Sequence, residues 1–147
     1  MTEKEKIHSG NIYFPNGDEI LEEQLAYLDL MDAYNRTSRL QFDKRRELLQ
    51  QLFAEVGEGT YVESPYFGNW GGHHVHLGRN VYINAGLKLV DDTHIYIGDY
   101  SMLGPNVVAV GNPCRVLRPI GEHDREYYWR DRKIDPALFD GEWESGF

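Results

Sequence analysis

Aliphatic residues recur every six positions in the middle of the chain, between residues 75 and 112. Two series carry the pattern, and a two-residue insertion separates them: Leu77, Ile83 and Leu89, then Ile97, Leu103 and Ala109. A small or polar residue follows most of these positions. A repeat of this length predicts a parallel β-helix, in which each hexapeptide forms one short strand and three strands complete a coil. The aliphatic side chains are then expected to stack on those of the neighbouring coils.

The segment before the repeat, residues 1–57, has a helical pattern. Thr2-Glu3-Lys4-Glu5 has the form of a capping box and predicts a short helix that ends near Ser9-Gly10. A second helix is expected to begin with Asp18 as its N-cap and to end at Asn35-Arg36-Thr37. Its apolar face would be formed by five residues at helical spacing: Ile20, Leu21, Leu25, Leu28 and Met31.

A third helix is predicted between Ser38 and Gly57. Ser38 and Gln41 have the spacing of another capping box, and Gly57 is a favourable residue just after a helix end. The expected apolar stripe consists of Phe42, Leu48, Leu49, Leu52, Phe53 and Val56. We expect the three helices to cover one end of the β-helix.

The rest of the chain divides into two further segments. Residues 58–118 are predicted to form the hexapeptide-repeat β-helix, with 58–74 as an irregular first coil and 113–118 as a last strand. Residues 119–147 form a C-terminal tail that is expected to pack on the β-helix or on a neighbouring subunit. Its aromatic residues are Tyr127, Tyr128, Trp129, Phe139, Trp143 and Phe147.

The outer surface of the predicted β-helix favours self-association. Alternate strand residues, including Tyr82, Tyr96 and His76, should point outward and leave fairly flat flanks. About two and a half coils bury little apolar area alone, so neighbouring copies would cover these flanks and the open strand edges. We therefore expect a homotrimer.

Charge and composition restrict the partners and the compartment. The net charge of −9 over 147 residues argues against binding to nucleic acid or to an anionic membrane surface. No apolar run reaches the length of a membrane span, and the polar start lacks the apolar core of a signal peptide. The single cysteine, Cys114, excludes an internal disulfide and suits a reducing compartment. These features predict a cytoplasmic protein.

Ordered motifs occur inside and outside the repeat: Glu3-Lys4-Glu5-Lys6, Lys44-Arg45-Arg46-Glu47-Leu48-Leu49, Phe53-Ala54-Glu55-Val56-Gly57, Val75-His76-Leu77-Gly78, Val81-Tyr82-Ile83-Asn84, Val90-Asp91-Asp92, Ile97-Gly98-Asp99, Gly104-Pro105-Asn106-Val107 and Ala109-Val110-Gly111-Asn112-Pro113-Cys114-Arg115-Val116. Together they resemble the maltose and galactoside O-acetyltransferase family over almost the whole chain. The resemblance implies a mainly β fold, a left-handed parallel β-helix with an N-terminal helical region, assembled as a homotrimer. It also implies acetyl transfer to a sugar hydroxyl, with acetyl-coenzyme A as co-substrate and no permanently bound cofactor. The left-handed turn of the β-helix is implied only by the family resemblance. The general rule for parallel crossovers would predict a right-handed turn.

The chain departs from the family pattern after Val107. In the family, the segment equivalent to Gly104-Pro105-Asn106-Val107 leads into a Thr-x-x-His-Pro-like stretch with the catalytic histidine, and several coils follow. Here the next residues, 108–113, resemble the far end of the family's β-helix. This predicts an internal deletion joined in phase with the repeat. No His-Pro dipeptide is present, and none of the six histidines occupies the position of the family's base, so no catalytic residue is assigned.

Three residues align with family positions that line the acceptor-sugar pocket: Tyr82, Asn84 and Asp92. The resemblance implies that the Asp92 carboxylate binds a sugar hydroxyl. The structural alternatives are a flank-packing aromatic for Tyr82, a turn residue for Asn84 and a solvated corner for Asp91-Asp92. The residues that bind acetyl-coenzyme A stay unknown, because the family's site lies along the later coils.

The segment His73-His74-Val75-His76 raises a metal-binding alternative. On a strand, His74 and His76 share one face and could offer two imidazoles to one ion. No carboxylate or cysteine completes a ligand set, and the histidine before Leu-Gly is an ordinary family residue. We therefore expect no metal site.

The sequence leaves two functional hypotheses. The first is a sugar O-acetyltransferase family protein whose activity is lost or much reduced, because the catalytic histidine and the later coils are absent. The alternative is a non-catalytic trimeric scaffold or a sugar-binding remnant.

Overall fold

The computed structural model describes residues 1–105, 108–110, 127–129 and 132–133. The chain divides into two compact units, residues 1–114 and 115–147. In the second unit, β10 (Tyr127–Trp129) pairs antiparallel with β11 (Arg132–Lys133). The expected strand at residues 113–118 and the side chains of the aromatic tail lie outside the described residues.

Three helices precede the strands in the described part of the first unit: α1 (Glu3–Ser9), α2 (Asp18–Asn35) and α3 (Phe42–Leu52). The capping box of α1 is confirmed. Thr2 Oγ1 accepts a hydrogen bond from the Glu5 N–H at 3.1 Å, and the Glu5 carboxylate accepts one from the Thr2 N–H at 2.7 Å. Gly10 has a φ of 75° and ends the helix.

The starts of α2 and α3 differ from the sequence prediction. Gly17 is the N-cap of α2 and Asp18 is the first helical residue, where its carboxylate interacts favourably with the helix dipole. Ser38 and Gln41 form a turn before α3 instead of capping it. The Gln41 N–H donates to the Ser38 carbonyl, and the Gln41 side-chain oxygen accepts from the Ser38 N–H, both at 3.0 Å.

The buried faces of the helices are narrower than predicted. Ile20 and Met31 of α2 are buried as expected, and Tyr34, which the apolar pattern missed, is fully buried. The exposed members of the predicted stripes are Leu21, Leu25 and Phe42. The buried face of α2 is therefore rotated toward Tyr34.

The end of α3 lies at Leu52 rather than at Gly57, because the following residues join the β-helix. Strand β1 (Glu55–Val56) pairs in parallel with β4 (Val75–Leu77), so the first coil begins earlier than residue 58. A Cβ atom added at Gly57 would clash with the backbone of Gly78 in the next coil. This glycine therefore allows close packing of two coils and does not end a helix.

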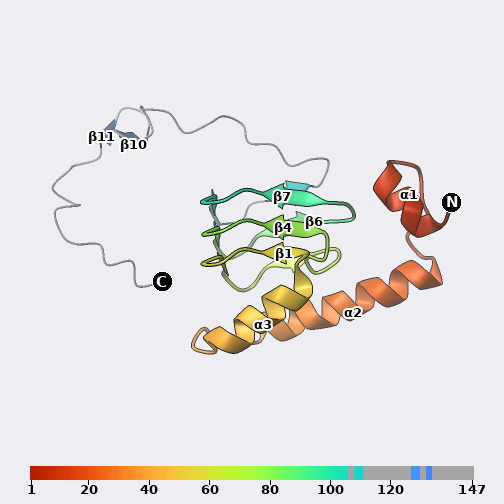
Figure 1. Ribbon diagram of the computed structural model, residues 1–147, viewed down its shortest axis with the longest axis horizontal. Helices are drawn as coiled ribbons and strands as arrows, with labels where there is room; N and C mark the ends of the chain where they lie inside the picture. Colours follow the sequence, from red (N-terminus) through yellow and green to blue (C-terminus); the bar gives the residue numbers. More distant parts are fainter. Residues whose placement is uncertain (106–107, 111–126, 130–131, 134–147) are drawn as a thin grey trace. The chain divides into compact units, whose positions relative to one another are not determined.

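The remaining strands of the first unit are β2 (Tyr61–Val62), β3 (Phe67–Gly68), β5 (Tyr82–Ile83), β6 (Lys88–Val90), β7 (Ile95–Ile97), β8 (Met102–Leu103) and β9 (Val108–Val110). They form three parallel sheets in the orders β1-β4-β7, β2-β5-β8 and β3-β6-β9. Every third strand therefore stacks on its predecessor, as a β-helix requires. Figure 1 shows β1, β4 and β7 stacked in this way, with α3 leading into β1.

The register confirms the hexapeptide repeat. The paired residues of successive coils are Leu77 with Ile97, Ile83 with Leu103 and Leu89 with Ala109. From Leu77 to Ile97 the chain advances by 20 residues, which is three hexapeptides and the two-residue insertion. The aliphatic residues of the two series therefore lie beside one another.

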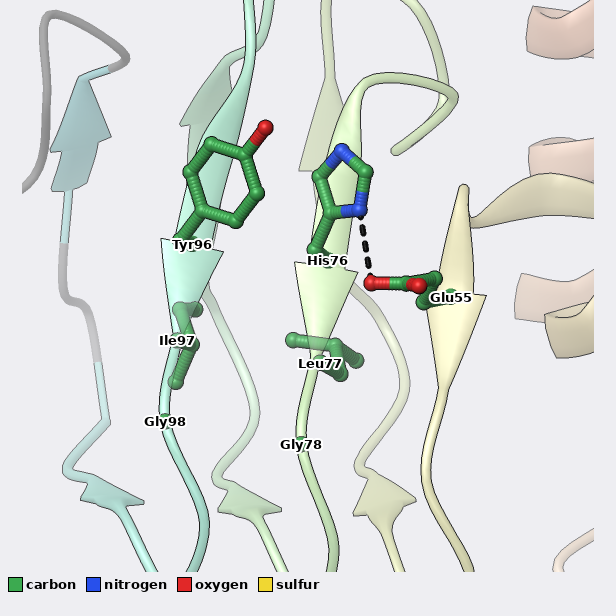
Figure 2. Close-up of a pocket in the computed structure, with 7 residues that line it drawn as sticks. All are labelled: Glu55, His76, Leu77, Gly78, Tyr96, Ile97 and Gly98. Atoms are coloured by element: carbon green, nitrogen blue, oxygen red, sulfur yellow. Dashed lines mark hydrogen bonds and ion pairs between the residues drawn. The ribbon is translucent and has the colours of Figure 1, made fainter.

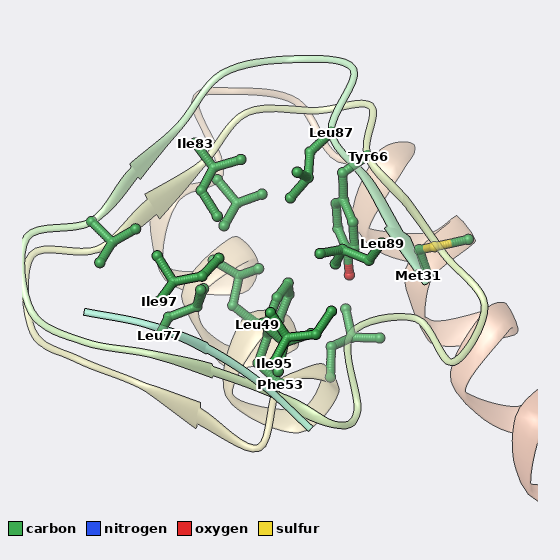
Figure 3. Packing of buried hydrophobic residues seen from close by; sticks show 14 of the residues in the cluster. Met31, Leu49, Phe53, Tyr66, Leu77, Ile83, Leu87, Leu89, Ile95 and Ile97 are labelled. Atoms are coloured by element: carbon green, nitrogen blue, oxygen red, sulfur yellow. The ribbon is translucent and has the colours of Figure 1, made fainter. Parts of the chain in front are cut away.

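Aliphatic side chains from all three sheets fill the interior of the β-helix. Figure 3 shows Ile83, Leu87 and Ile95 pointing inward from different sides, and all three are fully buried. Burying one side chain of this size stabilises a fold by about 1.5–3 kcal/mol. The stacked repeat is thus the main apolar core.

A buried arginine joins the helices to the first coil. Arg45 of α3 donates to the Tyr34 hydroxyl and to the Val62 carbonyl, both at 3.0 Å. It also donates to the hydroxyls of Thr37 at 2.9 Å and Ser64 at 3.2 Å. These bonds connect α2, α3 and the segment around β2, so these two of the three helices cover the first coil as predicted.

Candidate functional site

The three residues predicted to bind a sugar lie at two corners of one coil. Tyr82 belongs to β5, and Asn84 lies in the turn that follows it. Asp92 lies at the next corner, between β6 and β7. One chain therefore places Tyr82 beside Asn84 but brings Asp92 to a separate position, and the assignment of the three to sugar binding stays a prediction.

Tyr82 and Asn84 have structural partners. The ring of Tyr82 stacks on that of Tyr61 at 6.3 Å between centroids, and its hydroxyl donates to Glu63 at 3.4 Å. Burial and the nearby Glu63 carboxylate raise the pKa of Tyr82, so its hydroxyl stays a neutral donor. The Asn84 side-chain oxygen accepts from the Ala85 N–H at 2.8 Å, as expected of a turn residue.

Asp92 lies in a polar environment next to the N-terminal segment. Its Oδ1 accepts from the Asn69 amide at 3.4 Å, and Gln24 of α2 donates to the Asn69 carbonyl at 2.8 Å. Burial, and then the Asp92 carboxylate, raise the pKa of Tyr13. The corner thus combines donors and acceptors that can form hydrogen bonds with hydroxyl groups.

Asp91 is fully buried, so the solvated corner considered for Asp91-Asp92 is wrong for this residue. Its carboxylate accepts from the Trp70 N–H at 2.9 Å and from the Gly72 N–H at 2.8 Å. Burial raises the pKa of Asp91, and the two backbone donors oppose the rise. The carboxylate is needed because the turn around Gly71 would otherwise bury two unpaired N–H groups.

Five of the six histidines gather where the turn before β4 lies against the turn between β6 and β7: His8, His73, His74, His76 and His94. The contacting rings have centroid separations between 4.8 Å, for His8 and His74, and 5.6 Å, for His74 and His94. His8 comes from α1, which also places Ile7 against the buried Trp70. The packing of α1 on this corner completes the histidine cluster.

Two members of the cluster, His76 and His94, form a hydrogen-bonded chain with Glu55. His76 Nδ1 lies 2.8 Å from Glu55 Oε2, and His76 Nε2 lies 2.9 Å from His94 Nδ1. Figure 2 shows the bond between Glu55 and His76, with the ring of Tyr96 beside that of His76. The rings of His76 and Tyr96 stack at 4.3 Å.

The other cluster members are buried more deeply or bonded to the backbone. His74 is buried, and its Nδ1 donates to the Asp91 carbonyl at 2.6 Å. Burial lowers the pKa of His74 to about 4. His73 stacks on Tyr27 at 3.8 Å, and burial also lowers its pKa.

The described residues contain no group of three or more His, Cys, Asp or Glu side chains that could hold a metal ion. The sequence analysis singled out three of the clustered histidines, His73, His74 and His76, but it did not predict that His8, His94 and Glu55 would join them. One signal could have revealed Glu55. Once residues 55–56 are recognised as the first strand of the β-helix, the repeat places Glu55 beside His76 of the next coil. In the described part of the chain, no helix combines the length and apolar character of a membrane span.

Comparisons with known proteins place this arrangement in a class. The maltose acetyltransferase hexapeptide capping motif matches residues 6–57, the helical segment and the start of the first coil. A galactoside acetyltransferase solved with coenzyme A superposes with a TM-score of 0.69 at 26% identity, covering 92% of this chain and 99% of that one. A hexapeptide-repeat acetyltransferase of Vibrio cholerae solved with acetyl-coenzyme A gives 0.65 at 26% identity, covering 74% and 57%. The fold is that of the hexapeptide-repeat acetyltransferases.

Two relatives of known name within this class are both galactoside O-acetyltransferases. The galactoside O-acetyltransferase of Lactococcus lactis is 41% identical over 102 residues, which are 69% of this chain and 49% of that relative. The galactoside O-acetyltransferase of Escherichia coli is 27% identical over 202 positions, covering 94% of this chain and 99% of the relative. The chain is similar to the maltose and galactoside O-acetyltransferases, and its match spans about half the length of the Lactococcus protein.

The Escherichia coli comparison also contains a large gap. The alignment has 202 positions and this chain has 147 residues, so at least 55 positions have no residue of this chain opposite them. Because the alignment covers almost all of both chains, the unmatched positions lie mainly inside it.

Proposed function

We propose that this chain is a shortened sugar O-acetyltransferase in which acetyl transfer from acetyl-coenzyme A is lost or strongly reduced. The observation that carries the proposal is the gap of at least 55 positions against the Escherichia coli relative. We assign this gap to the point after Val107, where the family's catalytic His-Pro segment is expected. The residues implied for the base and for the donor site are then absent together.

The strand register supports an in-phase deletion. Strand β9 begins directly after the proposed junction, yet it pairs with β6 in the same register as the preceding coils, with Ala109 beside Leu89. Loss of a segment out of phase would shift the pairing of β9 with β6 to another register. An in-phase loss preserves the fold and removes only the coils between.

The family also supports the assembly and the acceptor that we propose. We infer a left-handed β-helix that forms a homotrimer, in which corners of neighbouring subunits face one another. Such an assembly would explain how Asn84 and Asp92, at separate corners of one chain, contribute to one acceptor-sugar site with Tyr82.

A thiol-release assay tests the loss of activity. The full chain is incubated with acetyl-coenzyme A and maltose, glucose or a galactoside, beside a full-length galactoside acetyltransferase as positive control. Losing a general base alone lowers a rate by about 10²–10⁴-fold, so we expect thiol release at the background level. Acceptor-dependent turnover clearly above background would refute the proposal.

The second candidate is a non-catalytic trimeric scaffold that still binds a sugar. The polar environment of Asp92, with Asn69 and Tyr13 beside it, favours this alternative. Calorimetric titration with the same sugars should give saturable heat, and Asp92→Asn should weaken it. If no sugar binds while light scattering shows a trimer, only the scaffold role is left.

A further inference from the structure

Helix α1 brings a histidine against imidazoles that belong to the β-helix. His8 lies in the last turn of α1, and its ring is 4.8 Å from that of His74 and 5.3 Å from that of His94. His74 belongs to the turn before β4, and His94 belongs to the turn between β6 and β7. The contact between α1 and the β-helix therefore places three titratable rings against one another.

Few other contacts hold α1 among the described residues. Ile7 is its buried residue and packs with Ile20 and Trp70. Lys4 forms an ion pair with Glu23 of α2 at 2.6 Å. A helix of seven residues is marginal by itself, so the position of α1 depends on these contacts and on the histidine cluster.

Carboxylates pair with only two of the five imidazoles in the described part of the chain. Glu23 Oε1 lies 3.8 Å from His73 Nε2, and Glu55 Oε2 lies 2.8 Å from His76 Nδ1. A positive charge on either of these rings would therefore be partly offset. The other three rings, which include His8, have no such partner among the described residues, so positive charges on them would repel one another.

The remaining titratable groups around the cluster are phenols or groups with another partner: Tyr27, Tyr96, Asp91, Asp92, Lys4 and Lys6. The Asp91 carboxylate accepts two backbone N–H groups, and the Asp92 carboxylate accepts from the Asn69 amide. The two lysines pair with glutamates of α1 and α2. Each carboxylate in this set thus has a partner other than an imidazole.

We propose that the histidine cluster is an acid-sensitive switch, in which protonation of His8 and of the rings that it contacts releases α1 from the β-helix while the coils stay folded. At neutral pH the uncharged rings pack together, and α1 covers Trp70. Histidine becomes charged within the range of about pH 5–8, so mild acid places like charges on both sides of the contact. Release of α1 then exposes Trp70 to solvent.

The direction of the response follows from proton linkage. Burial is the largest cause that lowers the pKa values of His73, His74 and His94, and the imidazole of His8 lowers all three further. Departure of α1 removes the influence of His8, so the released form binds protons more tightly than the docked form. For each ring whose pKa rises by one unit on release, acid increases the ratio of released to docked protein by up to about tenfold.

The core of the β-helix is separate from the cluster that α1 covers. Ile7, Ile20 and Trp70 form one group of buried residues. The aliphatic residues of the coils, including Ile83 and Ile95, form another. Release of α1 therefore opens the small group and leaves the stacked coils in place, as expected of local unfolding.

Quenching of Trp70 fluorescence by acrylamide measures the release. Trp70 is 2% exposed, and Trp129→Phe with Trp143→Phe leaves it as the only tryptophan of the full chain. Fluorescence lifetimes convert the data to a quenching rate constant, which excludes quenching by the protonated imidazoles themselves. We expect this constant to rise about threefold or more from pH 7 to pH 5, while far-UV circular dichroism still shows the folded chain. Salt at about 1 M should reduce the rise, because it screens charges on exposed rings.

Three outcomes of this measurement would overturn the switch. The first is a quenching constant that is equal at both pH values. The second is a rise that salt does not reduce. The third is a rise accompanied by loss of the whole circular dichroism signal, since acid would then unfold the coils together with α1.

Variants in the same background test whether charge at position 8 drives the release. His8→Gln cannot gain a charge, so most of the rise at pH 5 should disappear. Lys6→Gln is the matched control on the same helix: it removes a positive charge that is paired with Glu3, and it should keep the rise. His8→Glu places a negative charge against the protonated rings, so the quenching constant should be no higher at pH 5 than at pH 7.

The charge variants also separate repulsion from packing. If His8 only filled space, His8→Gln and His8→Glu would both loosen α1 at either pH. A full rise in His8→Gln, loss of the rise in Lys6→Gln, or a rise in His8→Glu as large as that of the parent would contradict the switch.

Discussion

Protonation of His74 is expected to destabilise the fold between pH 7 and pH 5. The ring is buried in the turn before β4, with Nδ1 bonded to the carbonyl of Asp91, which follows β6. Burial lowers its pKa from 6.5 to about 4, and the surrounding imidazoles add to the effect while the bond to Asp91 opposes it. The titratable residues around the ring are His8 of α1, His73, His94 and Asp91.

The magnitude follows from the difference between the folded and unfolded pKa values of His74. Because the folded pKa is the lower one, the unfolded chain binds more protons between pH 6.5 and pH 4, and stability falls as the pH decreases. The contribution is complete above pH 6.5 and disappears progressively toward pH 4. For one such group, the free energy of unfolding decreases by about 2 kcal/mol from pH 7 to pH 5.

Urea unfolding at both pH values, at one protein concentration, measures this effect in the parent chain and in His74→Asn. Asparagine can still donate to the Asp91 carbonyl, but it does not titrate. The loss of stability on acidification should therefore be about 2 kcal/mol smaller in the variant than in the parent. An equal loss in both proteins would refute the assignment to His74, since other groups would then cause the whole pH dependence.

Three further substitutions test the packing by thermal or urea unfolding. Arg45→Met leaves several buried acceptors unpaired and should destabilise the fold by about 3 kcal/mol; a change below about 1 kcal/mol would contradict the buried network. Asp91→Asn can accept only one of the two backbone N–H groups and should cost about 1–3 kcal/mol, whereas unchanged stability would argue against the double bond pattern. Gly78→Ala places a Cβ against Asp99 and should cost about 1–3 kcal/mol, while Gly98→Ala enters open space and should change stability by less than about 0.5 kcal/mol. Equal effects of the two alanines would contradict the coil spacing.

The β-helix could be predicted from the sequence because its hydrophobic period reports directly on stacking. Leu77 and Ile97 lie in neighbouring coils because the repeat, with its insertion, returns the chain to the same face. The first coil lacked such a regular signal. Gly57 resembled a helix end, and only the close approach of Gly78 shows that it belongs to the coil packing.

The histidine cluster could not be predicted from the period. His8 and His94 are far apart in the sequence, and they meet because α1 packs on the corner between β6 and β7. Asp91 looked like a solvated turn residue, since the sequence does not show which backbone N–H groups need an acceptor. Both features depend on tertiary contacts at a corner, where the chain has no repeat to follow.

The proposed deletion would preserve the fold while removing the family's catalytic residues, and repeat packing explains why. In a repeat fold, each coil contacts only its neighbours, so removing whole coils leaves the remaining contacts in place. The pairing of Leu89 with Ala109 across the coils shows that the register continues into β9. A catalytic site has no such local redundancy, because its base and donor site belong to particular coils. Removing whole coils therefore preserves the packing of the core but abolishes a catalytic site that belongs to the removed coils.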